Sequence, residues 1–157
     1  MGEIVDLQGN EVISEDDRWL AGALFCWLSD TRVRIALELA GENNKAMGTL
    51  WLNLKNHLQN DIPYTPGPLR EAALRILSHD QVRGEVARVV GLSQEAQLDE
   101  WAKDMDEWLR TPEKEEPGPK PERPPKQSDE QIMIELGKLK FDLEARVKRA
   151  QSPLILQ

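Results

Sequence analysis

The chain has 157 residues, of which 31% are charged, and its formal net charge is −8 at pH 7. This length fits one domain with an appendage, and no apolar run approaches the ~18–20 residues that a membrane-spanning helix needs. The acidic balance argues against a general nucleic-acid binder, because contacts with phosphates require clustered Lys and Arg.

Charge is unevenly distributed along the chain. Residues 1–31 carry seven acidic residues and one basic residue, and residues 93–110 carry six acidic and two basic ones. We interpret these stretches as a solvated surface that keeps the protein soluble. Residues 32–60 are slightly basic instead. Their Lys and Arg residues are Arg32, Arg34, Lys45 and Lys55.

The cysteine content and the first residues bear on the compartment. Cys26 is the single cysteine, so no internal disulfide can form. The sequence MGEIVDLQGNEV at the start is acidic and lacks the basic region of a signal peptide. We therefore expect a reducing, cytoplasmic setting.

The first 13 residues place short apolar runs on either side of Gly9-Asn10. This pattern is typical of a small hairpin or of an extended arm that packs on the rest of the chain. An isolated hairpin is marginal in water, so either form would need a surface to lean on.

Six short helices are predicted next, because apolar residues recur there at helical spacing between capping and stop residues. Ser14 and Asp80 are candidate N-caps, and Gly41 and Gly91 are candidate stops. The expected helices span about residues 14–28, 31–40, 43–59, 68–78, 80–90 and 94–110. Together they predict an all-α fold, a compact bundle of five or six short helices.

Two of these helices are rich in tryptophan. The first is so apolar, with Trp19 and Trp27 on one broad face, that we expect it at the centre of the core. Cys26 lies between two aromatic residues there and is predicted to be a buried, inert thiol. The last helix is expected to direct Trp101 and Trp108 inward.

A proline-rich stretch comes after these helices, TPEKEEPGPKPERPPKQ from Thr111 to Gln127, with six prolines and no large apolar residue. Such a composition favours extended, semi-rigid conformations over packing in a core. It divides the chain into a helical body (residues 1–111), a charged linker (residues 112–127) and a C-terminal segment (residues 128–157).

The C-terminal segment has the pattern of an amphipathic helix. Ser128 and Gln131 form a capping box, and the apolar residues after it alternate in four- and three-residue steps, which is typical of a helix that packs along a partner helix. The residues of this stripe are Ile132, Leu136, Leu139 and Leu143. A hairpin that turns at Gly137-Lys138 is the rival interpretation. The stripe is predicted to bind another protein, to self-associate, or to fold back on the body.

Two sequence motifs indicate functions other than protein binding. Residues 83–102 contain a degenerate helix-turn-helix, with Gly91 at the turn, but its second helix is strongly acidic, opposite to what a major groove requires. In the other motif His57 precedes His79-Asp80, with Asp99 or Asp104 downstream. This order resembles the HD-type metal phosphohydrolases over four residues, which implies a metal site that activates water. Asp80 already has a capping role at a helix start, which explains it without a metal.

We therefore expect a non-enzymatic protein-binding adaptor or assembly factor that acts through its C-terminal helix, without cofactor or metal. Its partner would be another protein or a second copy, bound through residues 128–157; a membrane or nucleic acid is not expected. The alternative is a nucleic-acid-associated regulator or packaging factor, with the helix-turn-helix at 83–102. Its contacts would then come from Arg32, Arg34, Lys45 and Lys55.

Overall fold

The computed structural model of the chain describes residues 15–60, 65–111 and 118–151, which form six α-helices and no strand. The all-α prediction is confirmed for these residues, whereas the predicted hairpin at 3–13 lies outside them. None of the helices in the described part is long and apolar enough to cross a membrane. The helices are α1 (Glu15–Ser29), α2 (Thr31–Leu39), α3 (Asn44–Asn60), α4 (Pro66–Ser78), α5 (Asp80–Arg110) and α6 (Asp129–Gln151).

Local signals fix several helix ends. Asp30 caps α2, since its carboxylate accepts the Val33 N–H at 3.1 Å. Gly41 ends α2 in a left-handed conformation, at φ 89°, and the two hydrogen bonds that close this turn are those of a Schellman motif. The predicted capping box of α6 is confirmed: Ser128 and Gln131 exchange hydrogen bonds of 3.2 Å between side chain and backbone. Residues 129–151 are therefore a helix and not a hairpin.

The helix-turn-helix at 83–102 is wrong, because α5 runs without a break through Gly91. A glycine inside a helix costs only about 1 kcal/mol relative to alanine, and the packing of α5 against α6 outweighs that cost. Gly91 is also where α6 crosses α5. A Cβ placed on it would lie 3.7 Å from Ile132 Cδ1, in ordinary van der Waals contact. The two short helices expected on either side of Gly91 are thus one long helix.

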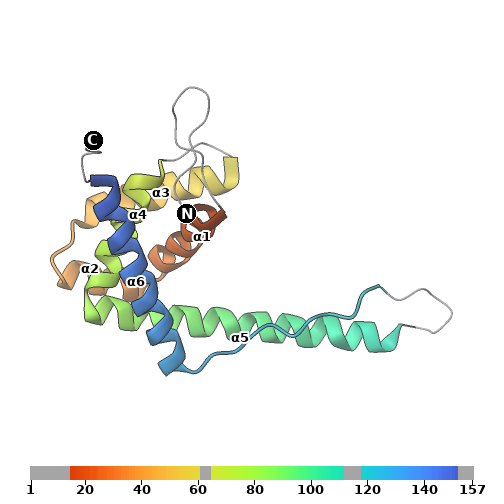
Figure 1. Ribbon diagram of the computed structural model, residues 1–157. Helices are drawn as coiled ribbons and strands as arrows, with labels where there is room; N and C mark the ends of the chain where they lie inside the picture. The colour runs from red at the N-terminus through yellow and green to blue at the C-terminus, as the bar shows by residue number, and fades with distance from the viewer. Residues whose placement is uncertain (1–14, 61–64, 112–117, 152–157) are drawn as a thin grey trace, which may run out of the picture.

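The core lies where α4 meets α1, α5 and α6 (Figure 1). Apolar residues from all six helices are buried in it, including Leu24 of α1, Leu54 of α3, Ile76 of α4 and Val86 of α5. α6 packs along α4 and crosses α5, so the last described helix of the chain completes a core that the earlier helices begin.

Most of the predicted partner stripe of α6 is turned into this core. Ile132, Leu136 and Leu143 are only 1%, 5% and 2% exposed, and Leu139 is half-buried. Among the outcomes expected from sequence, the structure shows the helix folded back on its own chain. Binding of a partner through these side chains stays a prediction, as does the division at residues 111 and 128. In this conformation the inner side of the stripe is already occupied.

Ion pairs tie the helices together at their ends. Asp17 of α1 and Arg70 of α4 form a buried bidentate pair, with N–O distances of 2.9 and 2.8 Å. Asp16, one residue earlier, pairs with Arg146 of α6 at 3.4 Å. Both contacts join the start of α1 to helices that are distant in sequence. They fix the position of α1 next to α4 and α6.

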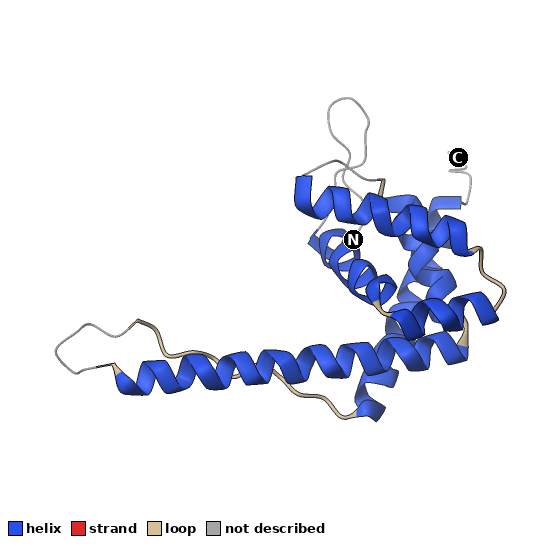
Figure 2. Ribbon diagram, turned by 180° about the vertical axis from the view of Figure 1, so that it is seen from behind, coloured by secondary structure: helices blue, strands red, loops and turns tan. Residues whose placement is uncertain are grey.

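The second half of α5 leaves the bundle and projects from it as an arm (Figure 2). The chain returns along this arm as residues 118–127 before α6 begins (Figure 1). Trp101 and Trp108 were predicted to point into the core, but they lie on the arm and are half-buried beneath this returning segment. The arm therefore has its own small apolar contact, separate from the core.

Candidate functional site

A groove of about 880 Å³ opens between α1, α5 and α6. We call it the interhelical groove. Its walls come from residues 18–27 of α1, 89–97 of α5 and 132–142 of α6, and its polar end is closed by Pro125 and Gln127. The volume falls in the range of natural ligand sites. Three helices that pack well elsewhere thus leave an open channel on one side of the bundle.

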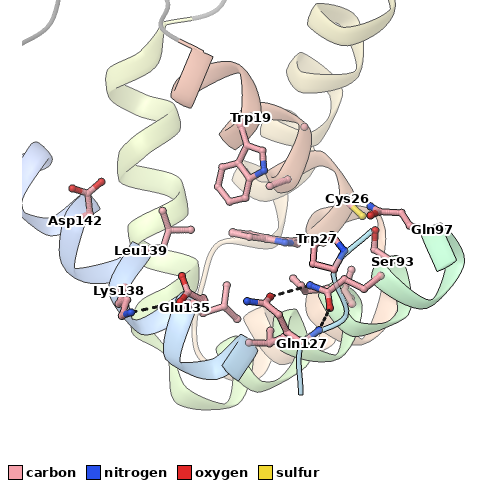
Figure 3. A pocket seen from close by; sticks show the side chains of 18 of the residues that line it. Trp19, Cys26, Trp27, Ser93, Gln97, Gln127, Glu135, Lys138, Leu139 and Asp142 are labelled. Atoms are coloured by element: carbon pink, nitrogen blue, oxygen red, sulfur yellow. Dashed lines mark hydrogen bonds and ion pairs between the residues drawn. The ribbon is translucent and has the colours of Figure 1, made fainter. Parts of the chain in front are cut away.

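The α1 wall combines an exposed aromatic ring with a strip of small residues. Trp19 is 60% exposed although its helix was expected to be central. Because α1 is apolar almost all round, one side of it fills the core and the other is left to line the groove. Trp19 and Trp27 both line the groove (Figure 3). Between them lie Gly22 and Ala23, and a Cβ on Gly22 would meet nothing within 4 Å.

The α6 wall brings in three of the four predicted partner-binding residues. Ile132, Leu136 and Leu139 line the groove, whereas Leu143 is in the core without lining it. Leu139 projects toward the groove in Figure 3. The predicted stripe therefore contributes to two places. Its inner edge packs in the core, and Leu139 lies at the mouth of the groove.

Amide groups form the polar end of the groove. The Gln94 side chain donates to Gln127 Oε1 at 3.0 Å and accepts the Gln127 backbone N–H at 2.8 Å, as the dashed lines in Figure 3 show. This pair anchors the returning segment to α5 just before α6 starts. Ser93 and Gln97 lie at the same end. The groove is thus apolar along its length and able to hydrogen-bond at one end.

Cys26 also lines the groove, and its predicted burial is wrong, because the residue is exposed. The helical spacing turns it away from the core that Leu24 and Leu28 enter. Desolvation at the groove wall, and then the negative charge of Asp30, raise the pKa of the Cys26 thiol. It is therefore accessible but not activated as a nucleophile.

Charges of both signs border the groove. Glu135 and Lys138 of α6 pair with each other at 3.5 Å, and Asp142 pairs with Arg146 at 3.2 Å. Arg18, on the opposite wall, has no acidic partner within the described residues. The α1 side therefore offers a cation to whatever occupies the groove.

The predicted metal set is not assembled. His79 pairs with Glu42 through Nε2 at 2.8 Å, and Asp80 pairs with Arg83 at 2.6 Å. His57 lies on α3. In the described part of the chain, no three His, Cys, Asp or Glu side chains are grouped as metal ligands are. His79 and Asp80 hold the corner between α4 and α5.

The basic residues singled out for nucleic acid lie on two helices. Arg32 and Arg34 are exposed on α2, and Lys45 and Lys55 are on α3, ten residues and so about 15 Å apart along its axis. The Lys55 ammonium lies 5.4 Å from the centre of the Trp51 ring, where a cation–π contact holds it. Because α5 is continuous through Gly91, the helix-turn-helix of the nucleic-acid alternative is not formed. Contact of these four basic residues with nucleic acid stays a prediction.

Comparison with known proteins found no matching family model, no similar curated protein and no similar solved structure. A function must therefore be inferred from the geometry of the groove and of the arm. Sequence reasoning missed the groove, although one signal was present. A helix that is apolar on more than one face, with Gly22-Ala23 beside two tryptophans, has more apolar surface than one core can cover.

Proposed function

We propose that the protein is a non-enzymatic protein-binding adaptor or assembly factor, whose binding site is the interhelical groove and whose partner contributes an amphipathic helix. The observation that carries this proposal is the exposed apolar wall of α1 around Trp19, which faces the groove and is not covered by the described residues. Exposed apolar surface bordered by charges is typical of sites where proteins meet.

A helix fits the groove better than an extended peptide does. All three walls are helices and no sheet edge is available within the described part to pair with a strand. Gly22 and Ala23 leave room for another backbone to approach α1 closely. Arg18 on the α1 wall favours an acidic residue on the partner, whereas Glu135 and Asp142 on the α6 wall are already paired with Lys138 and Arg146.

A binding role agrees with the state of the reactive groups. His79 is engaged with Glu42, and the raised pKa of Cys26 disfavours its thiolate at neutral pH. Neither the His79 imidazole nor the Cys26 thiol is therefore activated for catalysis. The single cysteine supports the proposal of a reducing, cytoplasmic setting.

Two matched double variants test the site. Trp19→Ala with Leu139→Ala removes one aromatic and one aliphatic side chain from the groove. Ile134→Ala with Phe141→Ala removes the same types from the outer side of α6, where they are 52% and 76% exposed. A buried aromatic anchor contributes about 2 kcal/mol or more, so the groove pair should weaken binding about 30-fold.

Partners are captured from the source cell with each full-length variant, and affinities are then measured with the purified partner. The proposal requires that the groove pair loses the partner and the outer pair keeps it. Loss with the outer pair alone would move the site to the other side of α6. Equal capture by both variants would refute a site on either surface.

A photo-crosslinker attached to Cys26 gives an independent readout, because this thiol lies on the groove wall and is the only one in the chain. Labelling should be done above neutral pH, where more of the thiol is ionised, because its pKa is raised. A cross-link to a helical, amphipathic segment of the partner is the expected result. Cross-links confined to an extended segment would contradict the helix.

A further inference from the structure

Residues 118–127, GPKPERPPKQ, lie on the arm of α5 with a regular repeat. We call this segment the proline strap. Pro121, Pro124 and Gln127 are half-buried, and the other seven residues are exposed. Burial at every third residue is what a polyproline II helix produces when one of its edges rests on a surface, because it has three residues per turn. The prolines favour this conformation before any contact forms.

The arm carries a stripe that matches this repeat. We call it the indole stripe. Its half-buried residues recur in three- and four-residue steps: Leu98, Trp101, Met105 and Trp108. The two tryptophans are seven residues, or about 10.5 Å, apart along the helix axis. Trp108 Nε1 donates to the Gly118 carbonyl oxygen at 3.0 Å, and Trp101 Nε1 donates to that of Pro121 at 3.3 Å. Three residues of polyproline II helix advance about 9.3 Å, so both indoles reach a carbonyl in register.

Cations of the strap follow the same repeat. The Lys120 ammonium lies 6.0 Å from the centre of the Trp108 ring, and the Arg123 guanidinium lies 5.8 Å from that of Trp101. Both distances fit cation–π contacts. The surroundings reinforce them, because residues 94–110 carry six acidic and two basic residues, whereas the strap carries three basic and one acidic.

Each of these contacts is made to a feature that any basic polyproline II segment offers. The indoles bind backbone carbonyls, and the rings bind cations spaced by three residues. The contacts are few and border on solvent, with Lys120 and Arg123 themselves exposed. A segment held in this way can be exchanged for another of the same chemistry without disturbing the core, where no residue of the strap is buried.

We propose that the indole stripe is a recognition site for proline-rich peptides with basic residues at three-residue spacing, and that a partner protein supplies such a peptide, which displaces the strap. The strap is then an internal competitor. As a tethered segment it acts at an effective concentration in the millimolar range or above, so it sets the affinity that an incoming peptide must exceed. The strap reaches the groove at Pro125 and Gln127, but none of the residues of the indole stripe lines it. A site on the indole stripe therefore goes beyond the proposed function.

The test uses the full-length chain and a synthetic peptide of sequence GPKPERPPKQ. A released variant carries three substitutions in the strap, Pro121→Ser, Arg123→Ser and Pro124→Ser. They keep the length of the strap but remove side chains with which it contacts the indole stripe. Binding is followed by the indole N–H signals of Trp101 and Trp108 in ¹H–¹⁵N NMR spectra, while circular dichroism checks that the helices persist.

The released variant should bind the peptide saturably, and the intact chain at least about tenfold more weakly, because its own strap competes. Adding Trp101→Phe to the released variant keeps a ring but removes the N–H donor, and should weaken binding several-fold. A peptide with Gln in place of its first Lys and its Arg should also bind more weakly, and added salt should reduce the affinity of the original peptide.

Three results would overturn the proposal. The first is a folded released variant whose two indole signals do not shift at millimolar peptide. The second is equal affinity for the intact and released chains, which would place binding elsewhere. The third is a dimer of the intact chain, seen by light scattering, that the peptide dissociates, because the stripe would then belong to a second copy. If the released variant does not fold, Lys120→Gln with Arg123→Gln is the milder replacement, and the same outcomes apply.

Discussion

Replacing Leu143 by alanine decides whether α6 belongs to the core in solution. Leu143 is 2% exposed and lies among buried side chains, so its loss removes both apolar burial and packing. Substitutions of this kind cost about 2–5 kcal/mol. Domains have a total free energy of unfolding of about 5–15 kcal/mol, so this is a large part of it. Two residues away, Phe141 is 76% exposed, and its replacement by alanine should change the stability by less than about 0.5 kcal/mol.

Both variants are unfolded in urea at 25 °C and followed by tryptophan fluorescence. With a slope of about 2 kcal/mol/M, Leu143→Ala should lower the midpoint by about 1–2.5 M. The same packing leads us to expect that a chain ending near Thr111 loses cooperative unfolding, because α6 buries Ile132, Leu136 and Leu143 in the core. If the Leu143 and Phe141 variants are equally stable, α6 does not dock as the structure shows, and its stripe is free for a partner.

Other substitutions test single contacts. Asp17→Asn removes the negative charge that faces the buried Arg70 guanidinium and should cost about 3–5 kcal/mol in urea unfolding, and Asp17→Leu with Arg70→Met should recover most of that. Desolvation acts to raise the pKa of Asp30, but hydrogen bonds from a backbone N–H and a guanidinium outweigh it, so that the pKa is lowered. Its charged form thus adds stability above about pH 4 that is lost as the pH falls through the lowered pKa, and Asp30→Asn should flatten the acid side of the stability profile, whereas an unchanged profile would contradict the assignment. Gly41→Ala should destabilise by about 1–2 kcal/mol because φ is positive there, while Gly84→Ala, inside α5 with open space around it, should stabilise by about 0.5–1 kcal/mol; thermal unfolding that ranks them the other way would refute this account of the turn.

Sequence patterns predicted those parts of the fold that depend on neighbouring residues. The capping box at Ser128 and the stop at Gly41 each act within one helical turn, so the local sequence contains all the information. The prediction that Gly91 ends a helix was wrong because it considered only neighbouring residues. The small cost of this glycine in a helix interior is outweighed by long-range packing against Ile132, which no local pattern contains.

The candidate sites were predictable only in part. The apolar stripe on α6 could be recognised in the sequence. Its side chains can be buried equally well by a partner or by other helices of the same chain. Only the structure shows that Ile132 and Leu136 lie in the core. Trp101 and Trp108 follow a helical spacing that indicates burial, but the spacing does not show which part of the chain covers them. The proline-rich composition predicted an extended segment, but contained no sign that it would lie on these two rings.

The projecting arm affects how the molecule moves through solvent. α5 has 31 residues and is about 46 Å long, whereas a compact chain of 157 residues has a radius of gyration of about 15 Å. The arm raises the frictional coefficient without adding mass, so a monomer elutes early from a gel-filtration column and resembles a larger species calibrated on globular standards. Sedimentation equilibrium measures mass independently of shape. Small-angle scattering of the same monomer would show pair distances extending well beyond those of a sphere of equal mass.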